Sequence, residues 1–192
     1  MHRSSHLRNW ILAALFVVLM TISARLTLPI PLVPITLQFT VVALAGLLLG
    51  PGLGALSMAV YVFMGLAGLP VFATGGGIGY MLSPTIGYLA GFIAAAAVIG
   101  LLTKKAPRKN GKPVLWALLL AVLAGLAVDY ALGVLGLWAV LNLVKGKGTA
   151  LPAALALGTV PYLIGDGIKS VLAAGLGLVL LPIKERIWAN RP

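Results

Sequence analysis

The chain of 192 residues contains no cysteine, and only three of its residues are acidic. Without thiols it can form no disulfide framework, no zinc–thiolate site and no thiol redox centre. Three carboxyl side chains and two N-terminal histidines also leave few of the groups from which a nucleophile–base pair or a metal centre is built. We therefore expect a protein that is not an enzyme and that has no catalytic residues, no metal site and no cofactor.

Charged side chains are also scarce, at 9% of the residues, against roughly 25% in a soluble domain. Hydrophobic residues make up 61% of the chain, and the mean hydropathy is +1.11. A helix that spans a bilayer needs about 20 apolar residues. The sequence thus predicts an all-α membrane protein with six transmembrane helices in one integral membrane domain over residues 1–192. The expected spans are 10–28, 36–50, 54–68, 84–103, 114–138 and 161–181, with a short interfacial helix near 151–157.

Lysine and arginine number fourteen, which gives a formal net charge of +11. These residues cluster between the apolar segments, a pattern typical of membrane topology, so a lipid bilayer and not a nucleic acid is the expected partner. If the chain has six spans, ten of the lysines and arginines fall on the side that holds both termini and three on the other side. The remaining one, Lys169, lies within the last span. The positive-inside rule then predicts that both termini are cytoplasmic, in a multi-pass protein of the bacterial cytoplasmic membrane.

The long irregular links, 29–34, 70–83 and 142–160, all fall on the outer side in this topology. Binding residues concentrate on loops held by a rigid scaffold, so we expect a small-molecule site open to the outside. In the middle link, Gly75, Gly76 and Gly77 allow the backbone to approach a ligand closely or to close over it. The loop lacks the Gly-Lys-Ser/Thr ending of a phosphate-binding P-loop, so nucleotide binding is not expected.

Asp166 and Lys169 are the strongest candidates for a binding site, because ionisable residues within a span are costly. A spacing of three places them on one face of a helix. An aspartate only accepts hydrogen bonds and a lysine only donates them. Together they suit a cyclic urea or amide, although the lysine could instead hold a carboxylate. The alternative is a self-neutralising ion pair without a ligand.

Five further polar or aromatic residues are weaker candidates. Asp129 either hydrogen-bonds to a neighbouring helix or takes part in the site. Arg25 either extends its side chain to the membrane surface or contributes to the site. Gln38 fits an interhelical hydrogen bond as well as a ligand contact, and Tyr80 and Tyr88 either stack on a ligand or pack against neighbouring helices.

Six sequence pieces occur together, in order, within Ala13 to Leu181. They are PITLQ at 34–38, GLLLGP at 46–51, GLPVF at 68–72, GGGIGY at 75–80, SPTIGYLAGF at 83–92 and GDGIK at 165–169. In this combination the chain resembles the BioY family of biotin transporters, the biotin-specific S components of energy-coupling-factor (ECF) transporters.

The resemblance implies a six-helix S-component fold that binds biotin near the outer face. It also implies a membrane coupling (T) subunit and two cytoplasmic ATPase subunits as partners, since this chain contains no ATPase motif. Asp166 and Lys169 match the family's pair that contacts the ureido ring, and Gly75, Gly76 and Gly77 match the segment that lines the pocket. The chain departs from the family at Gly165, where a proline is common.

The chain also shows no asparagine near the glycine loop, where some members of the family place one, so a backbone group or Tyr80 takes its place. Two alternatives remain open from the sequence: an S component for another vitamin, and a solitary biotin carrier that forms oligomers and needs no ATPase.

Overall fold

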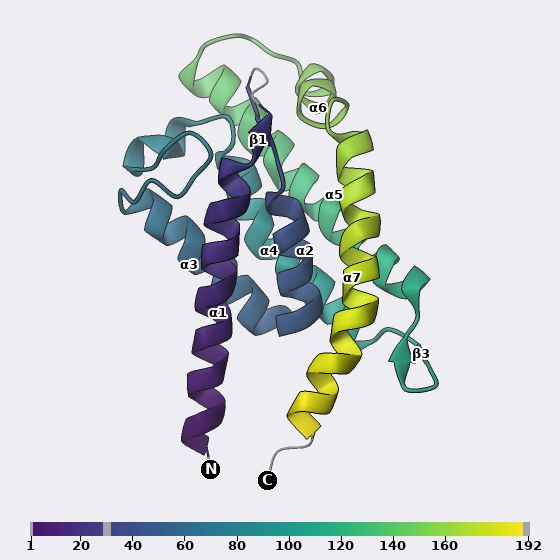
Figure 1. Cartoon of the computed structure of the whole chain (residues 1–192). Helices are drawn as coiled ribbons and strands as arrows, with labels where there is room; N and C mark the ends of the chain where they lie inside the picture. Colours follow the sequence, from purple (N-terminus) through teal and green to yellow (C-terminus); the bar gives the residue numbers. More distant parts are fainter. Residues whose placement is uncertain (1, 29–31, 190–192) are drawn as a thin grey trace.

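The structure, a computed structural model, describes residues 2–28 and 32–189. The chain folds into α-helices joined by links (Figure 1), together with a 3₁₀-helix and a π-helix. These are the 3₁₀-helix η1 (Ile78–Leu82) and the π-helix η2 (Val140–Val144), which continues α5. The α-helices are α1 (His2–Arg25), α2 (Gln38–Leu49), α3 (Pro51–Leu66), α4 (Ile86–Lys104), α5 (Leu115–Ala139), α6 (Leu151–Thr159) and α7 (Leu163–Ala189).

Four helical segments have the length and apolar composition to cross a membrane on their own. They are Leu7–Arg25, Ile86–Lys104, Leu115–Val144 and Leu163–Arg186. The other two predicted spans, 36–50 and 54–68, correspond to α2 and α3, which have 12 and 16 residues. At a rise of about 1.5 Å per residue these helices are about 18 and 24 Å long. Each is shorter than the hydrocarbon core of a bilayer, which is about 30 Å thick.

The first link differs from its predicted boundaries because it forms a small sheet. α1 ends at Arg25, and Thr27–Leu28 form strand β1 in place of the predicted last turn of the span. Strand β2 (Ile35–Thr36) pairs with it antiparallel, with Thr27 opposite Thr36. Because β2 occupies the predicted start of the second span, α2 begins at Gln38, two residues later than predicted.

α4 packs against α5, α3 and α2, and α2 lies between α4 and α7 (Figure 1). The contact between α4 and α5 is close because glycines face each other across it. A Cβ atom at Gly87 would lie 2.9 Å from the Cα of Gly136, nearer than real side chains come. The core beneath contains fully buried large side chains from α1, α2, α3, α4, α5 and the 70–73 segment, among them Met20, Leu47, Tyr61, Phe72, Ile99 and Leu118.

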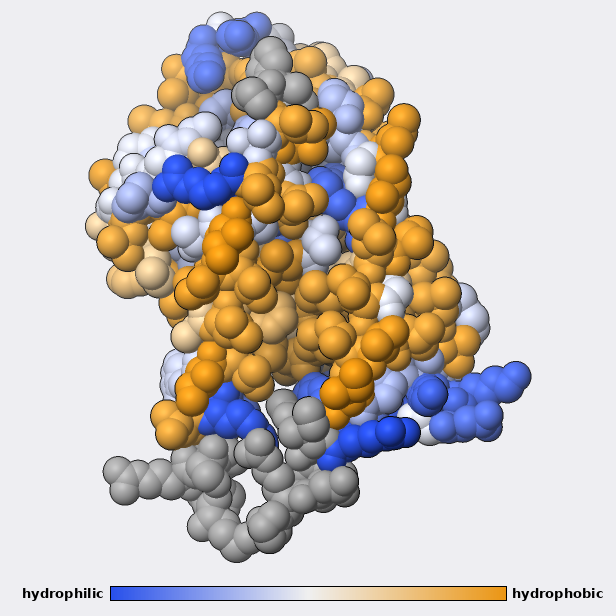
Figure 2. All heavy atoms as spheres, viewed as in Figure 1, coloured by the Kyte–Doolittle hydropathy of each residue, from blue (hydrophilic) through white to orange (hydrophobic). Residues whose placement is uncertain are grey.

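The outer surface of the helices is apolar over the middle of the molecule and polar at both ends (Figure 2). Large apolar side chains such as Ile11, Leu15, Ile164 and Leu172 are exposed on α1 and α7. Exposed apolar area of this extent is typical of a surface that contacts lipid. The start of α1, the end of α7 and the hairpin of β3 (Arg108–Lys109) and β4 (Lys112–Pro113) lie at one end of the molecule (Figure 1).

Candidate ligand-binding site

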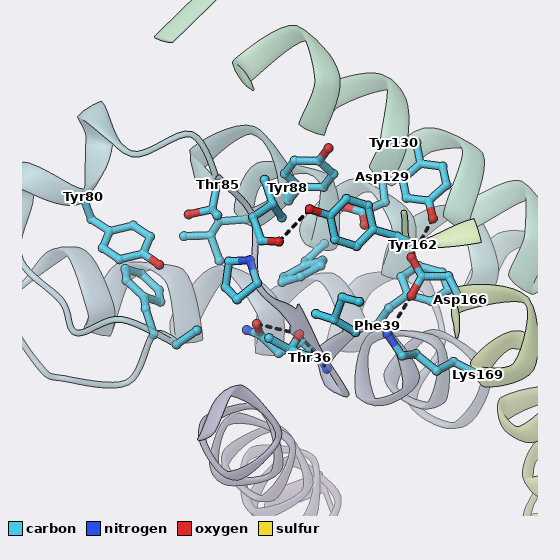
Figure 3. Close-up of a pocket in the computed structure, with 18 residues that line it drawn as sticks. Thr36, Phe39, Tyr80, Thr85, Tyr88, Asp129, Tyr130, Tyr162, Asp166 and Lys169 are labelled. Atoms are coloured by element: carbon cyan, nitrogen blue, oxygen red, sulfur yellow. Dashed lines mark hydrogen bonds and ion pairs between the residues drawn. The ribbon is translucent and has the colours of Figure 1, made fainter. Parts of the chain in front are cut away.

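A pocket lies between the first connection, the starts of α2, α4 and α7 and the middle of α5 (Figure 3). Its empty volume is about 630 Å³, including the part that is open to solvent. It is lined by Val33, Pro34, Ile35, Thr36, Gln38, Phe39, Phe72, Ala73, Tyr80, Thr85, Tyr88, Leu89, Phe92, Asp129, Tyr130, Tyr162, Asp166 and Lys169.

Asp166 and Lys169 lie side by side on the first turns of α7, and both side chains line the pocket (Figure 3). The Nζ of Lys169 donates to the Oδ1 of Asp166 at 2.7 Å, and the two residues are only 7% and 8% exposed. The hydroxyl of Tyr130, from α5, donates to the Oδ2 of Asp166 at 2.6 Å. Both carboxylate oxygens therefore accept one charge-assisted hydrogen bond, and each keeps a free lone pair for a ligand.

Gln38 joins the pocket to the core at the start of α2. Its Nε2 donates to the hydroxyl of Tyr61 at 2.8 Å, and that hydroxyl donates to the backbone oxygen of Val71 at 3.0 Å. The Oγ1 of Thr36 donates to the Oε1 of Gln38 at 3.1 Å. Gln38 thus lines the pocket and also makes the interhelical hydrogen bond that was its alternative interpretation.

The two candidate tyrosines have different surroundings. Tyr88, on α4, is buried and donates its hydroxyl to the backbone oxygen of Gly158 at 2.7 Å. Tyr80 belongs to η1, and its ring lies against Phe72 with centroids 4.5 Å apart. Its hydroxyl accepts a hydrogen bond from Thr74 at 3.1 Å. Both rings line the pocket, Tyr88 from its wall and Tyr80 from the loop that borders it.

Gly75, Gly76 and Gly77 do not line the pocket. Gly75 and Gly77 have φ values of +128° and +105°, a conformation that favours glycine, and the N–H of Gly77 donates to the backbone oxygen of Gly65 at 2.7 Å. Their part in this structure is to turn the loop that carries Phe72 and Tyr80 to the pocket.

Asp129 lies in the wall of the pocket on α5, whereas Arg25 lies outside the lining. Asp129 is 3% exposed, and its Oδ1 has no hydrogen-bond partner among the residues that the structure describes. The guanidinium of Arg25 donates to the backbone oxygen of Pro70, which ties the end of α1 to the start of the glycine-containing loop.

Tyr130 and Tyr162 were not predicted as site residues. Tyr162, just before α7, donates its hydroxyl to the backbone oxygen of Val33 at 2.6 Å and so links the last helix to the first connection. Tyr130 follows Asp129 directly in the sequence, in the same apolar span. That position was the only available signal, because the partner of each hydroxyl lies more than thirty residues away.

Comparisons with known proteins agree with the architecture. The model of the BioY family matches residues 1–186. The biotin transporter BioY of Thermotoga maritima is 41% identical over 175 residues, which is 91% of this chain and 96% of that protein. The BioY of Rhodobacter capsulatus is 40% identical, with 93% and 94% covered, and a probable BioY of Lysinibacillus sphaericus is 38% identical, with 85% and 82% covered. The crystal structure of the S-component for biotin from an ECF-type ABC transporter superposes with a TM-score of 0.80 at 26% identity, covering 94% of each chain.

Proposed function

The chain belongs to the BioY family, and from this premise we propose that it is the biotin-binding S component of a vitamin uptake transporter. Its family consists of transporters and not of enzymes. The observation that carries the proposal for the site is the Asp166–Lys169 pair, with Tyr130, in the wall of the pocket.

Biotin presents a cyclic urea, with two N–H groups beside one carbonyl. The free lone pairs of the Asp166 carboxylate suit the N–H groups, and the ammonium of Lys169 suits the carbonyl oxygen. Apolar side chains, including Phe39, Leu89 and Phe92, line the same pocket and suit the bicycle and the valerate chain. Tyr80 and Tyr88 supply ring faces at the border and wall of this space.

The proposed assembly is an energy-coupling-factor transporter in the bacterial cytoplasmic membrane. α2 and α3 pair with the four long helices to complete six membrane helices, and the termini and the basic β3–β4 hairpin lie on the cytoplasmic side. A membrane coupling subunit and two cytoplasmic ATPases would supply the energy for release to the inside. Oligomers of this chain are the alternative arrangement for a carrier without those subunits.

Substitution of the polar pair tests the proposal. We expect Asp166→Asn and Lys169→Ala to lower biotin affinity at least about tenfold, because each removes a charged group that hydrogen-bonds to the ureido ring, and such a bond is worth about 1.5–3 kcal/mol. Binding of labelled biotin to purified protein is the measurement, with thiamine and riboflavin as competitors. Glu185→Gln, at an exposed ion pair with Arg108 far from the pocket, is the matched control.

Undiminished binding in both variants would contradict the site. Displacement of biotin by another vitamin at equal concentration would contradict the choice of ligand. Uptake measured with and without coupling subunits then separates the ATP-driven transporter from the solitary carrier.

A further inference from the structure

Asp129 is a buried acid to which the proposed contacts with a ureido ring assign no role. It comes from the middle of α5 and lines the pocket that also contains Asp166 and Lys169 (Figure 3). Its Oδ1 is inaccessible to solvent and has no hydrogen-bond partner among the described residues. A Cβ atom at Gly91 would overlap this oxygen, so the backbone of α4 covers it closely.

Four side chains of the pocket lining donate hydrogen bonds to acceptors other than Asp129. The hydroxyl of Tyr88 donates to Gly158, and that of Tyr162 donates to Val33. From α5 and α7, Tyr130 and Lys169 both donate to the carboxylate of Asp166. An ionised Asp129 would therefore be a buried charge without a donor, which is far more costly than a buried neutral carboxyl group.

The net charge of the pocket lining also favours a protonated Asp129. The charged or titratable side chains that line it are Asp129, Asp166, Lys169 and the tyrosines 80, 88, 130 and 162. The tyrosine hydroxyls are neutral at ordinary pH. With both aspartates ionised the lining would carry one net negative charge, and with one protonated it is neutral. Asp166 accepts two charge-assisted bonds and is the ionised one, which leaves Asp129 as the proton carrier.

We propose that Asp129 is a proton-binding group of the pocket that is protonated in the free protein and stays protonated when an anionic ligand binds, so that loss of this proton at high pH weakens binding. The proton rests on a carboxyl oxygen of Asp129. The ligand's own carboxylate stays ionised, and no covalent bond to carbon changes. With biotin as the anion, this inference rests on the function proposed above.

The first test needs no ligand. The infrared C=O stretch of a protonated carboxyl group should be present in the purified protein and absent in Asp129→Asn. It should persist in Glu185→Gln, and these three residues, Asp129, Asp166 and Glu185, are the only side-chain carboxyls of the chain. If the band is missing from the wild-type protein, or persists in Asp129→Asn, the inference is wrong whatever ligand the pocket takes.

The second test is the affinity for biotin between about pH 5.5 and about pH 9, where ordinary carboxyls are ionised and ordinary lysines protonated. Above the pH at which Asp129 of the free protein loses its proton, binding must take that proton up again. The Kd then rises by up to about tenfold per pH unit. Asp129→Asn, which mimics the neutral acid, should bind with a flat profile that stays tight at high pH.

Two control variants test whether the pH dependence of the Kd comes from Asp129. Glu185→Gln and a variant in which His2 and His6 are replaced by asparagine should keep the pH dependence of the wild-type protein. A wild-type profile that stays flat over the pH range in which the infrared band is lost, or a sloping one in Asp129→Asn, overturns the proton linkage. Failure of the wild-type protein to bind biotin at any pH contradicts the proposed function instead, and the infrared band still decides whether Asp129 holds a proton.

Discussion

Single residues set the chemistry of the pocket through hydrogen bonds that join distant parts of the chain. Tyr130 and Lys169 reach Asp166 from two helices and hold its carboxylate in one orientation. Tyr162 holds the first connection against the last helix through Val33. The site is therefore preorganised by hydrogen bonds between its own side chains.

The hydroxyl of Tyr130 provides the sharpest test at this scale. We expect Tyr130→Phe to weaken biotin binding by about tenfold or more, because a hydrogen bond to a charged group is worth about 1.5–3 kcal/mol. Tyr162→Phe removes the same atom from a neutral hydrogen bond to a backbone oxygen and should cost less. Titration of both purified variants with biotin measures the difference, and equal losses in the two would contradict the role given to Tyr130.

The Asp166–Lys169 pair could be predicted from the sequence, because residues three apart on a helix must share a face. The roles of Tyr130 and Tyr162 could not, since their partners lie far away in the chain. The glycine loop shows a further limit. Three consecutive glycines indicate unusual backbone conformation, but the sequence does not tell whether that conformation touches the ligand or only aims Phe72 and Tyr80.

At the scale of elements, glycines decide how closely helices and loops approach. In α3, Gly65 leaves the space that the ring of Phe72 occupies, since a Cβ there would overlap that ring. Between α4 and α5, Gly87 and Gly136 let the two backbones touch. The first contact fixes the loop beside the pocket, and the second fixes the helix that carries Asp129 and Tyr130.

Gly65→Ala should displace Phe72 and loosen the loop that carries Tyr80. Overpacking of this kind costs about 1–3 kcal/mol, so we expect weaker biotin binding and a lower unfolding temperature in detergent. Gly52→Ala, in the same helix with open space around it, is the control and should change neither quantity. Unchanged binding in Gly65→Ala would show that the loop's position does not matter to the ligand.

Gly87→Ala is expected to force α4 and α5 apart and to lower the midpoint of thermal unfolding by several degrees, again through overpacking. The atoms that its methyl group would meet belong to the backbone of α5, which cannot rotate away. Gly175→Ala, in α7 with no atom within 4 Å of the added methyl, should leave the midpoint unchanged or raise it slightly. Equal midpoints in the two variants would argue against close packing of α4 on α5.

The described chain combines four long apolar helices with the shorter α2, α3 and α6, and on the face shown in Figure 2 polar groups gather toward the two ends. The apolar composition predicted the helices and their order. It could not predict that residues 27 and 36 pair as strands, because that contact joins residues from opposite sides of the proline-rich link. The orientation in the membrane rests on the distribution of lysine and arginine and can be tested directly.

The absence of cysteine makes that test clean, since any introduced thiol is the only one present. Asn110→Cys lies in the turn of the β3–β4 hairpin, and Lys147→Cys lies in the exposed link before α6. In intact cells, a membrane-impermeant maleimide should label Lys147→Cys but label Asn110→Cys only after the membrane is permeabilised. The reverse pattern would invert the proposed topology.

The position of Asp129 along α5 has an electrical consequence. It lies fourteen residues after Leu115, about 21 Å at 1.5 Å per residue, so that about a third of the hydrocarbon core separates it from the outer surface in the proposed orientation. An anion that moved inward to this depth against a negative interior would lose about 0.8 kcal/mol per 100 mV. The proton of Asp129 is in place before the ligand arrives, so it does not cancel this charge movement. Loading of the pocket would then be slightly less favourable in an energised cell than in a depolarised one.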